Sequence, residues 1–241
     1  MNAITPKQRM LAAYRGEAAD TVPIAPEFWY YLPAKLLGLN MIEFSRVPHW
    51  QALRQTFKHY GTEGWGAAFT GAPCPNVDCS SETTELPEGR LLTRTTCKTP
   101  HGTLTSASMA DPVEPGWSVE RSIKDFDRDW PAYQATTLGL IEEINWTPVQ
   151  RALDAVGEDF LLEAWMPAQF FDYIANGRDG GLEQGIYDLI EHEDFFTGLH
   201  EEYLDYVRRF AAAACEHTTA ESLCIGCSWS CISLISPAMW R

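Results

Sequence analysis

The apolar positions of this chain form short runs and helical stripes in alternation, with polar and aromatic residues between them. Three apolar runs predict buried strands, at residues 21–31, Asp159–Ala164 and Leu223–Ile225, the last closed by Gly226. Large polar or aromatic side chains follow each run. In a parallel α/β protein ligands bind beyond the carboxyl ends of the strands, so we expect a site there.

Helical spacing fills most of the remaining chain. Thr5 and Pro6 predict an N-cap and first helical residue, with Gln8 placed for a capping box and Gly16 at the end. Further helices are expected over residues 34–39, 42–60, 147–157, 170–177 and 182–216. A helical patch is also expected to start at residues 122–126.

Residues 77–109 differ from the rest of the chain. They are rich in Thr and Ser, and Pro-Glu-Gly at 87–89 and Pro-His-Gly at 100–102 interrupt them. Alternation between such turn signals predicts antiparallel hairpins. We interpret this segment as a β-hairpin insertion in a single domain that spans residues 1–241.

Alternating strands and helices indicate an α/β fold with parallel strands joined by right-handed crossovers. We expect a (β/α)8 TIM barrel of which only the first part is present. A doubly wound sheet would favour a glycine-rich phosphate turn after its first strand, and the sequence has none. Ser236 and Pro237 predict a helix start with only four residues after it, so we expect the chain to stop inside an element.

The net charge of −15 argues against binding to nucleic acid or to an anionic membrane surface. No signal peptide or membrane span is present in the sequence, so a cytoplasmic location is expected. The seven cysteines are an odd number, and reduced thiols are expected rather than a disulfide framework. Cys224, Cys227 and Cys231 have a spacing that could hold a soft metal, although Cys224 in an apolar strand suits a small hydrophobe better.

Candidate site residues follow the predicted strands. They are Glu27, Trp29 and Tyr30 after the first, Glu163, Trp165 and Tyr173 after the second, and Cys227, Ser228 and Trp229 after the third. Aromatic residues at a strand end can be core or the wall of a pocket for a flat ligand, and both interpretations stay open for the first group. A solvated or salt-bridged acid is the alternative for Glu27.

Several motifs, in this order, resemble the uroporphyrinogen decarboxylase superfamily, which also includes the methylcobamide:coenzyme M methyltransferases. They are Thr5–Arg9 with Arg15–Glu17 and Val22-Pro23, then Tyr31-Leu32-Pro33, Tyr173 to Gly177, Gly226 to Trp229, and Leu234 to Pro237. The resemblance spans nearly the whole chain. It implies the barrel fold, a small-molecule substrate, and hydrogen-bonding roles for Tyr173 and Ser228, which we take as the catalytic candidates.

Departures from the family pattern favour one branch. Decarboxylases carry two arginines before Tyr-Leu-Pro that clamp substrate carboxylates, and the matching positions here are Pro26 and Tyr30. The aspartate of the family's Asp-Ser-Trp loop is Cys227 here, and Asp78 lies in a different context from the decarboxylase aspartate. The segment from Cys79 to Ala107 and the turn from Thr99 to Gly102 look more like the methyltransferase branch.

The resemblance therefore implies a corrinoid-dependent methyltransferase that moves a methyl group to a thiol-type acceptor. It implies a zinc whose ligands are expected beyond Arg241, with none in this chain, and a corrinoid supplied by a partner protein. A homodimer is expected by analogy with the family. The alternatives are a decarboxylase of porphyrin biosynthesis with altered substrate anchoring, and an inactive fragment or corrinoid-binding module.

Overall fold

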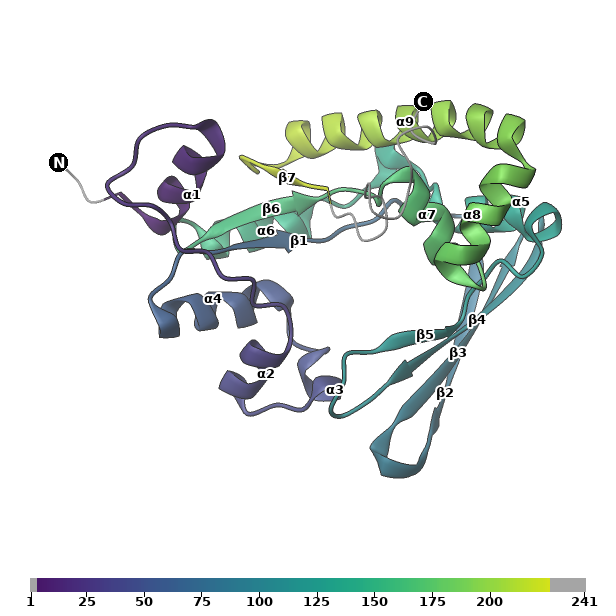
Figure 1. Cartoon of the computed structure of the whole chain (residues 1–241), viewed down its shortest axis with the longest axis horizontal. Coiled ribbons are helices and arrows are strands. Elements are labelled where there is room, and N and C mark those ends of the chain that lie inside the picture. The colour runs from purple at the N-terminus through teal and green to yellow at the C-terminus, as the bar shows by residue number, and fades with distance from the viewer. Residues whose placement is uncertain (1–3, 226–241) are drawn as a thin grey trace.

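A computed structural model describes residues 4–225 of the chain and shows a mixed α/β architecture (Figure 1). Its helices are α1 (Pro6–Arg15), α2 (Tyr31–Leu37), α3 (Met41–Phe44), α4 (His49–Tyr60), α5 (Phe126–Thr137), α6 (Thr147–Val156), α7 (Phe170–Gly177), α8 (Gly181–Glu191) and α9 (Glu193–His217). Its strands are β1 (Trp65–Ala68), β2 (Asp78–Glu85), β3 (Leu91–Thr99), β4 (Gly102–Ala110), β5 (Trp117–Glu120), β6 (Leu161–Trp165) and β7 (Leu223–Cys224). Two short 3-10 turns lie at Pro87–Gly89 and Ile141–Glu143.

Strands β1, β6 and β7 form a parallel sheet in that order, with Trp65 opposite Leu161 and Trp165 opposite Cys224. Figure 1 shows α9 above β7 and α4 below β1, toward the two edges of this sheet. One face of β6 packs into the main core, where Leu162 and Ala164 meet side chains of α4, α6 and α9. The predicted parallel strands at 159–164 and 223–225 are thus confirmed, and the sheet of the described residues is open.

The prediction of a strand at residues 21–31 is wrong. This stretch is an irregular segment, and its last residue, Tyr31, begins α2. Pro23 and Pro26 have no backbone N–H and would interrupt a ladder of hydrogen bonds. The Ile24 N–H donates instead to Oε2 of Glu63 (2.9 Å), and the Ile24 side chain is 69% exposed.

The strand β1 takes the place expected for residues 21–31 in the parallel sheet. Its sequence, Trp-Gly-Ala-Ala, lacks the β-branched residues that signal a strand. Gly66 is required there because a Cβ would lie 2.6 Å from Cδ1 of Leu53 in α4. This strand is therefore stabilised by close packing against α4, and its sequence lacks the hydrophobic pattern from which a strand is usually predicted.

The four strands β2 to β5 form an antiparallel sheet in sequence order. Three of them match the predicted hairpins, and β5 extends the sheet beyond residue 109. Cys79 and Cys97 face each other across β2 and β3 and form a disulfide. The expectation of reduced thiols is therefore wrong for this pair, whereas Cys74, Cys215 and Cys224 are free. Sequence spacing did not reveal the pairing because it depends on the register of the two strands.

A second core joins the antiparallel sheet to the helices. Leu104 of β4 packs among aromatic side chains of α5, α7 and α9, including Trp130, Tyr133 and Tyr203. The predicted helices over 147–157, 170–177 and 182–216 are confirmed, the last as α8 and α9. The N-cap positions of α6 and α9 are Trp146 and His192, and neither forms a side-chain cap hydrogen bond.

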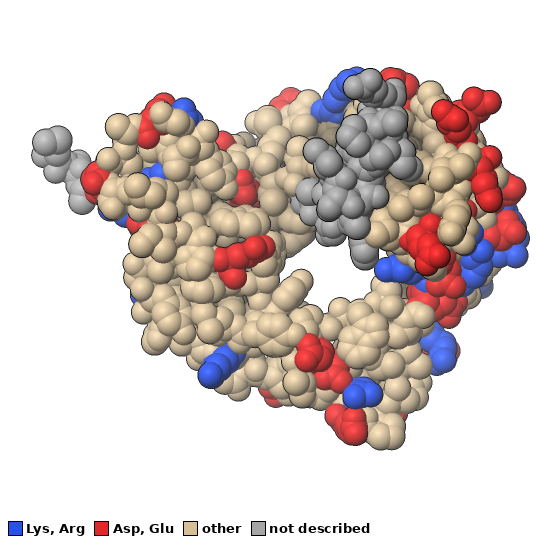
Figure 2. Space-filling model, in the orientation of Figure 1, with Lys and Arg blue, Asp and Glu red and all other residues tan. Residues whose placement is uncertain are grey.

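The helices α2 and α3 contact the loop between β4 and β5 of the antiparallel sheet. The Met41 N–H of α3 donates to the carbonyl of Pro112 (2.9 Å), in the loop between β4 and β5, and the Tyr31 hydroxyl donates to Glu114. Figure 2 shows the result, a ring of protein around a central opening. No helix within residues 4–225 is long and apolar enough to cross a membrane.

Candidate functional site

The face of the parallel sheet opposite the main core carries the polar groups. Side chains alternate along β6, so Leu161, Glu163 and Trp165 share this face, and Cys224 lies beside Trp165 in register. Leu161 is covered by Met10 and Leu11 of α1. Glu163 and Trp165 therefore lie toward the carboxyl end of the strand, where the sequence placed a site.

Glu163 is a buried carboxyl, with 4% of its surface exposed. The Ser222 hydroxyl, just before β7, donates a hydrogen bond to Oε1 of Glu163. Burial raises the pKa of Glu163, and the Ser222 hydrogen bond opposes this rise only in part. Glu163 thus holds its proton to higher pH than an exposed glutamate does.

Burial also changes the pKa of the neighbouring Cys224 thiol. Burial, followed by the negative charge of Glu163, raises the pKa of Cys224 to about 11. At neutral pH the side chain is a thiol and not a thiolate. Cys224 is therefore a poor nucleophile and metal ligand in this arrangement.

An open pocket of about 310 Å³ lies where the segment before α2, the helix α3 and the start of α4 meet the loop before β5. Its walls are Trp29, Tyr30, Met41, Phe44, Ser45, Val47, His49, Phe69, Pro115 and Gly116. Most of these side chains are aromatic or aliphatic, and none is Arg or Lys. The pocket suits a small ligand with a flat or apolar part, and it offers no cation to a carboxylate.

His49 is the histidine that lines this aromatic pocket. Its Nε2–H donates to the carbonyl of Trp29 (2.8 Å), and its ring stacks on the Trp29 indole with centroids 5.0 Å apart. Burial lowers the pKa of His49, so the ring is neutral near pH 7. The backbone hydrogen bond places the proton on Nε2, which leaves Nδ1 as an acceptor.

Ring contacts connect the aromatic pocket with the parallel sheet. Phe69, in the pocket wall, lies 4.9 Å from Trp165, and Trp29 meets Trp65 of β1 edge-on at 5.4 Å. The Trp29 indole N–H donates to the carboxylate of Glu27, which is exposed. Of the predicted residues, Trp29 and Tyr30 line the pocket, Glu27 is tied to its wall, and Trp165 connects it to Glu163.

Tyr173 lies elsewhere. It is buried in the second core, stacked between Tyr133 (5.3 Å) and Tyr203 (4.7 Å), and its hydroxyl shares a hydrogen bond with Thr137 (2.8 Å). Burial raises its pKa, so it does not ionise near neutral pH. Cys227, Ser228 and Trp229 lie outside the described residues.

Sequence reasoning missed His49, Phe69 and Ser222. His49 follows Pro48 at a helix start and so looked like part of a helical stripe. Phe69 follows β1, which the pattern did not reveal, and Ser222 precedes β7. Phe69 and Ser222 could have been found only from their positions next to strands. That signal can be used only once the strands themselves have been identified.

Metal ligands do not gather in this part of the chain. Across residues 4–225 no group of three or more His, Cys, Asp or Glu side chains could hold a metal ion. The residues around Glu163 therefore do not fit a zinc site, and we derive no reaction step through zinc.

Comparison with protein-family models, with curated proteins and with solved structures found no match for this chain.

Proposed function

We propose that the three parallel strands belong to a (β/α)8 barrel of the uroporphyrinogen decarboxylase type, and that the chain is an enzyme of methyl transfer. The observation that carries this proposal is the placement of Glu163 and Trp165 on the face of the sheet opposite the main core, with Trp165 next to the aromatic pocket. Ligand sites of α/β folds lie at this end of the strands. The order of the sequence motifs gives the reaction class by resemblance.

Glu163 has the properties of a proton-transfer group. In its ionised form a buried carboxylate with a raised pKa is a stronger base than an exposed one, and it can accept the proton of an acceptor thiol as sulfur gains a methyl group and release it later to water. Trp165 and Phe69 would exclude water from the acceptor. A methylcorrinoid, held by a partner protein, would supply the methyl group as an electrophile, and the electron pair of the broken cobalt–carbon bond would stay with the corrinoid.

The aromatic pocket disfavours a substrate with many carboxylates. It contains no Arg or Lys, and His49 is neutral near pH 7. Arg9, whose partner Glu63 also accepts a hydrogen bond from the Ile24 N–H, is already paired with Asp20 (2.6 Å) and Glu63 (2.7 Å). A porphyrinogen would therefore lose its bidentate clamps, whereas a small thiol would not need them.

Glu163 also supports the second candidate, a decarboxylase with altered substrate anchoring. Loss of carbon dioxide leaves an electron pair on carbon that needs a proton, and a carboxyl that stays protonated can deliver one. The substrate would then be a monocarboxylate, because nothing in the aromatic pocket pairs with further charges.

The two functions are separated by one set of assays on the full chain. Methylcobalamin is mixed anaerobically with 2-mercaptoethanesulfonate, with and without zinc, and its visible absorbance is followed; carbon dioxide release from uroporphyrinogen is measured in parallel. We expect thiol-dependent loss of methylcobalamin that falls at least tenfold in Glu163→Gln and is unchanged in Glu183→Gln, an exposed glutamate of α8. Carbon dioxide release without methyl transfer would replace the first proposal with the second, and absence of both activities would refute both.

A cytoplasmic location and a homodimer remain part of the proposal. The Cys79–Cys97 disulfide is of a kind more usual in oxidising compartments, so the location needs its own test. Fractionation of cells that produce the chain, with alkylation of free thiols before lysis, would show both the compartment and the redox state of the pair.

A further inference from the structure

A second pocket, of about 180 Å³, lies between the antiparallel sheet and the helices α5 and α7, apart from the aromatic pocket. Its lining is Thr95, Ser106, Ala107, Ser108, Ser118, Glu120, Arg121, Ser122, Tyr133, Asn176 and Gly177. The volume is far above the ~10–15 Å³ that one water needs. We call it the hydroxyl pocket, because five of its eleven lining residues carry an aliphatic hydroxyl.

The register of the sheet explains why hydroxyls gather there. Residues directly opposite each other in an antiparallel sheet share a face, and Ser106 is opposite Thr95 while Ser108 is opposite Ser118. The hydrogen bond between the Ser81 and Thr95 hydroxyls (2.8 Å) extends the same row to β2. Two rows of hydroxyls thus cross this face of the sheet, and the pocket lies where they reach β5.

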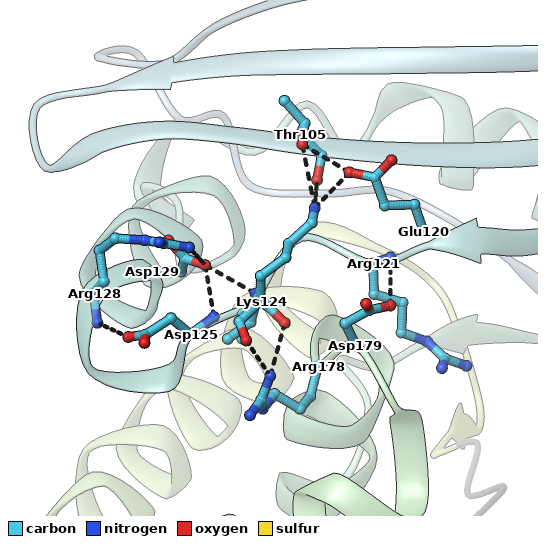
Figure 3. A network of polar contacts seen from close by, with 10 residues as sticks. Thr105, Glu120, Arg121, Lys124, Asp125, Arg128, Asp129, Arg178 and Asp179 are labelled. Carbon is cyan, nitrogen blue, oxygen red and sulfur yellow. Dashed lines mark hydrogen bonds and ion pairs between the residues drawn. The ribbon is translucent and has the colours of Figure 1, made fainter.

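Arg121 is the positive charge of the hydroxyl pocket. Its backbone N–H donates to Asp179 (3.5 Å), as Figure 3 shows, but within residues 4–225 its guanidinium forms no ion pair. The guanidinium lies over Gly181, the first residue of α8, where an added Cβ would be 2.6 Å from Nη1. A cation at the positive end of a helix is unfavourable unless an anion lies nearby.

The neighbouring charges are already paired with each other. The Lys124 ammonium lies 2.8 Å from Glu120, which also accepts a hydrogen bond from the Thr105 hydroxyl (2.8 Å; Figure 3). These contacts keep the pKa of Glu120 below its usual value, so Glu120 is ionised and its charge is matched by Lys124. Arg178, behind Lys124, is paired with the buried Asp188 (2.6 Å). Among the described residues, Arg121 is therefore the cation of this network whose guanidinium has no ion pair, and the neighbouring Asp179 carboxylate contacts its backbone N–H instead.

We propose that the hydroxyl pocket binds a phosphoryl group, with Arg121 as its cationic contact and Ser106, Ser108, Ser118 and Ser122 as hydroxyl donors. A guanidinium donates two parallel hydrogen bonds to a phosphate. Serine hydroxyls rotate to donate, and here they come from two strands and a loop, which suits the tetrahedral oxygens of a phosphate better than a planar carboxylate. A sugar would need free acceptors, and the Glu120 carboxylate is already engaged.

The test is calorimetric titration of the full chain with inorganic phosphate and with glycerol phosphate, the second of which shows whether an ester is preferred over the free ion. We expect saturable binding that weakens at least tenfold in Arg121→Gln and less in the double variant S108A/S118A. Arg151→Gln is the matched control. Arg151 is exposed on α6, so this substitution makes the same change in net charge outside the pocket.

Binding of acetate as tight as that of phosphate would overturn the assignment to a phosphoryl group. Equal binding of phosphate by Arg121→Gln and the unchanged chain, or no saturable binding by the unchanged chain, would overturn the site itself. Circular dichroism of each variant shows whether it is folded, and NMR shifts of the Arg121 side-chain N–H on titration locate the contact independently of any mutation.

Discussion

The Ser222 hydroxyl donates a hydrogen bond to Glu163, and this contact joins the residue before β7 to the middle of β6. Within residues 4–225 it is the one hydrogen bond of the buried carboxyl, and it connects two segments 59 residues apart in the chain. Because the carboxyl is taken out of water in the folded state, its protonation must be linked to folding.

The first prediction concerns the pH dependence of stability. The folded state raises the pKa of Glu163 above its ordinary value of 4.5, so the unfolded chain ionises first as the pH rises. The unfolded state then binds fewer protons, and its free energy falls relative to the folded state. The contribution of Glu163 to stability is therefore complete below pH 4.5 and is lost as the pH rises through the folded pKa. The slope is at most ~1.4 kcal/mol per pH unit.

Urea unfolding of the unchanged chain and of Glu163→Gln between pH 4 and pH 8 measures this loss. We expect the free energy of unfolding of the variant, relative to the unchanged chain, to increase with pH and then to level off. Glu183→Gln, which changes an exposed glutamate, should give a flat difference. A difference for Glu163→Gln that is independent of pH would contradict the raised pKa.

The second prediction concerns Cys224. Burial and the charge of Glu163 raise its pKa to about 11, so at pH 8 very little thiolate is present to react. Glu163→Gln removes the charge and should lower the pKa of Cys224, which speeds alkylation by iodoacetamide several-fold. Mass spectrometry of the modified peptides measures the rate at each cysteine. Cys215, exposed on α9, is the internal control and should react at one rate in both proteins, whereas an unchanged rate at Cys224 would count against the coupling.

Local sequence signals predicted the elements that depend on interactions between residues close together in the chain. The capping box of Thr5 and Gln8 forms as expected, with Gly16 in the left-handed conformation at the end of α1. The turns at 87–89 and 100–102 set the hairpins. These features depend on residues a few positions apart, which is why the pattern alone was sufficient.

Elements that depend on distant packing were not predictable in this way. Strand β1 exists because Gly66 lets Leu53 approach, and the apolar stretch around Ile24 stays irregular because of its two prolines. For the site, strand ends predicted Glu163 and Trp165, but nothing in the sequence placed Tyr173 between Tyr133 and Tyr203. The sequence indicated which residues lie near a strand end. Which of those side chains contact one another depends on the tertiary packing of the rings.

The third prediction concerns the disulfide between Cys79 and Cys97. It closes a loop of 18 residues across β2 and β3, and a crosslink of this length stabilises a protein by up to about 3 kcal/mol through the unfolded chain. Thermal unfolding with and without dithiothreitol should therefore show a lower midpoint on reduction. The double variant C79S/C97S should show the low midpoint without reductant and no further change with it.

Cys215→Ser is the control for this measurement, since Cys215 is free and exposed. It should leave the effect of dithiothreitol unchanged. If reduction fails to lower the midpoint of the unchanged chain, the pair is either unbonded in the isolated protein or carries no stability, and the prediction is wrong.

The fourth prediction compares two glycines in helices. Gly177, at the end of α7, lies against the ring of Tyr133, and a Cβ there would be 2.3 Å from Cζ. Tyr133 is buried and stacked on Tyr173, so the ring has little room to move, and Gly177→Ala should destabilise the chain by about 1–3 kcal/mol through overpacking. Gly198, within α9, has no atom within 4 Å of an added Cβ, so Gly198→Ala should stabilise by up to ~1 kcal/mol through helix propensity.

Urea unfolding monitored by circular dichroism at 222 nm, with tryptophan fluorescence as a second probe, gives both free energies. The two variants add the same methyl group, and helix propensity favours both of them, more strongly at Gly198 in the helix interior than at Gly177, the last residue of α7. A difference in sign between their changes in the free energy of unfolding then reports the space available around each glycine. Opposite signs are the expected result because the stacked rings of Tyr133 and Tyr173 are held by hydrogen bonds at both hydroxyls, from Tyr133 to the Tyr173 carbonyl and between Tyr173 and Thr137. A stabilising Gly177→Ala would mean that this stack yields to the methyl group, and the second core would then be looser than its contacts imply.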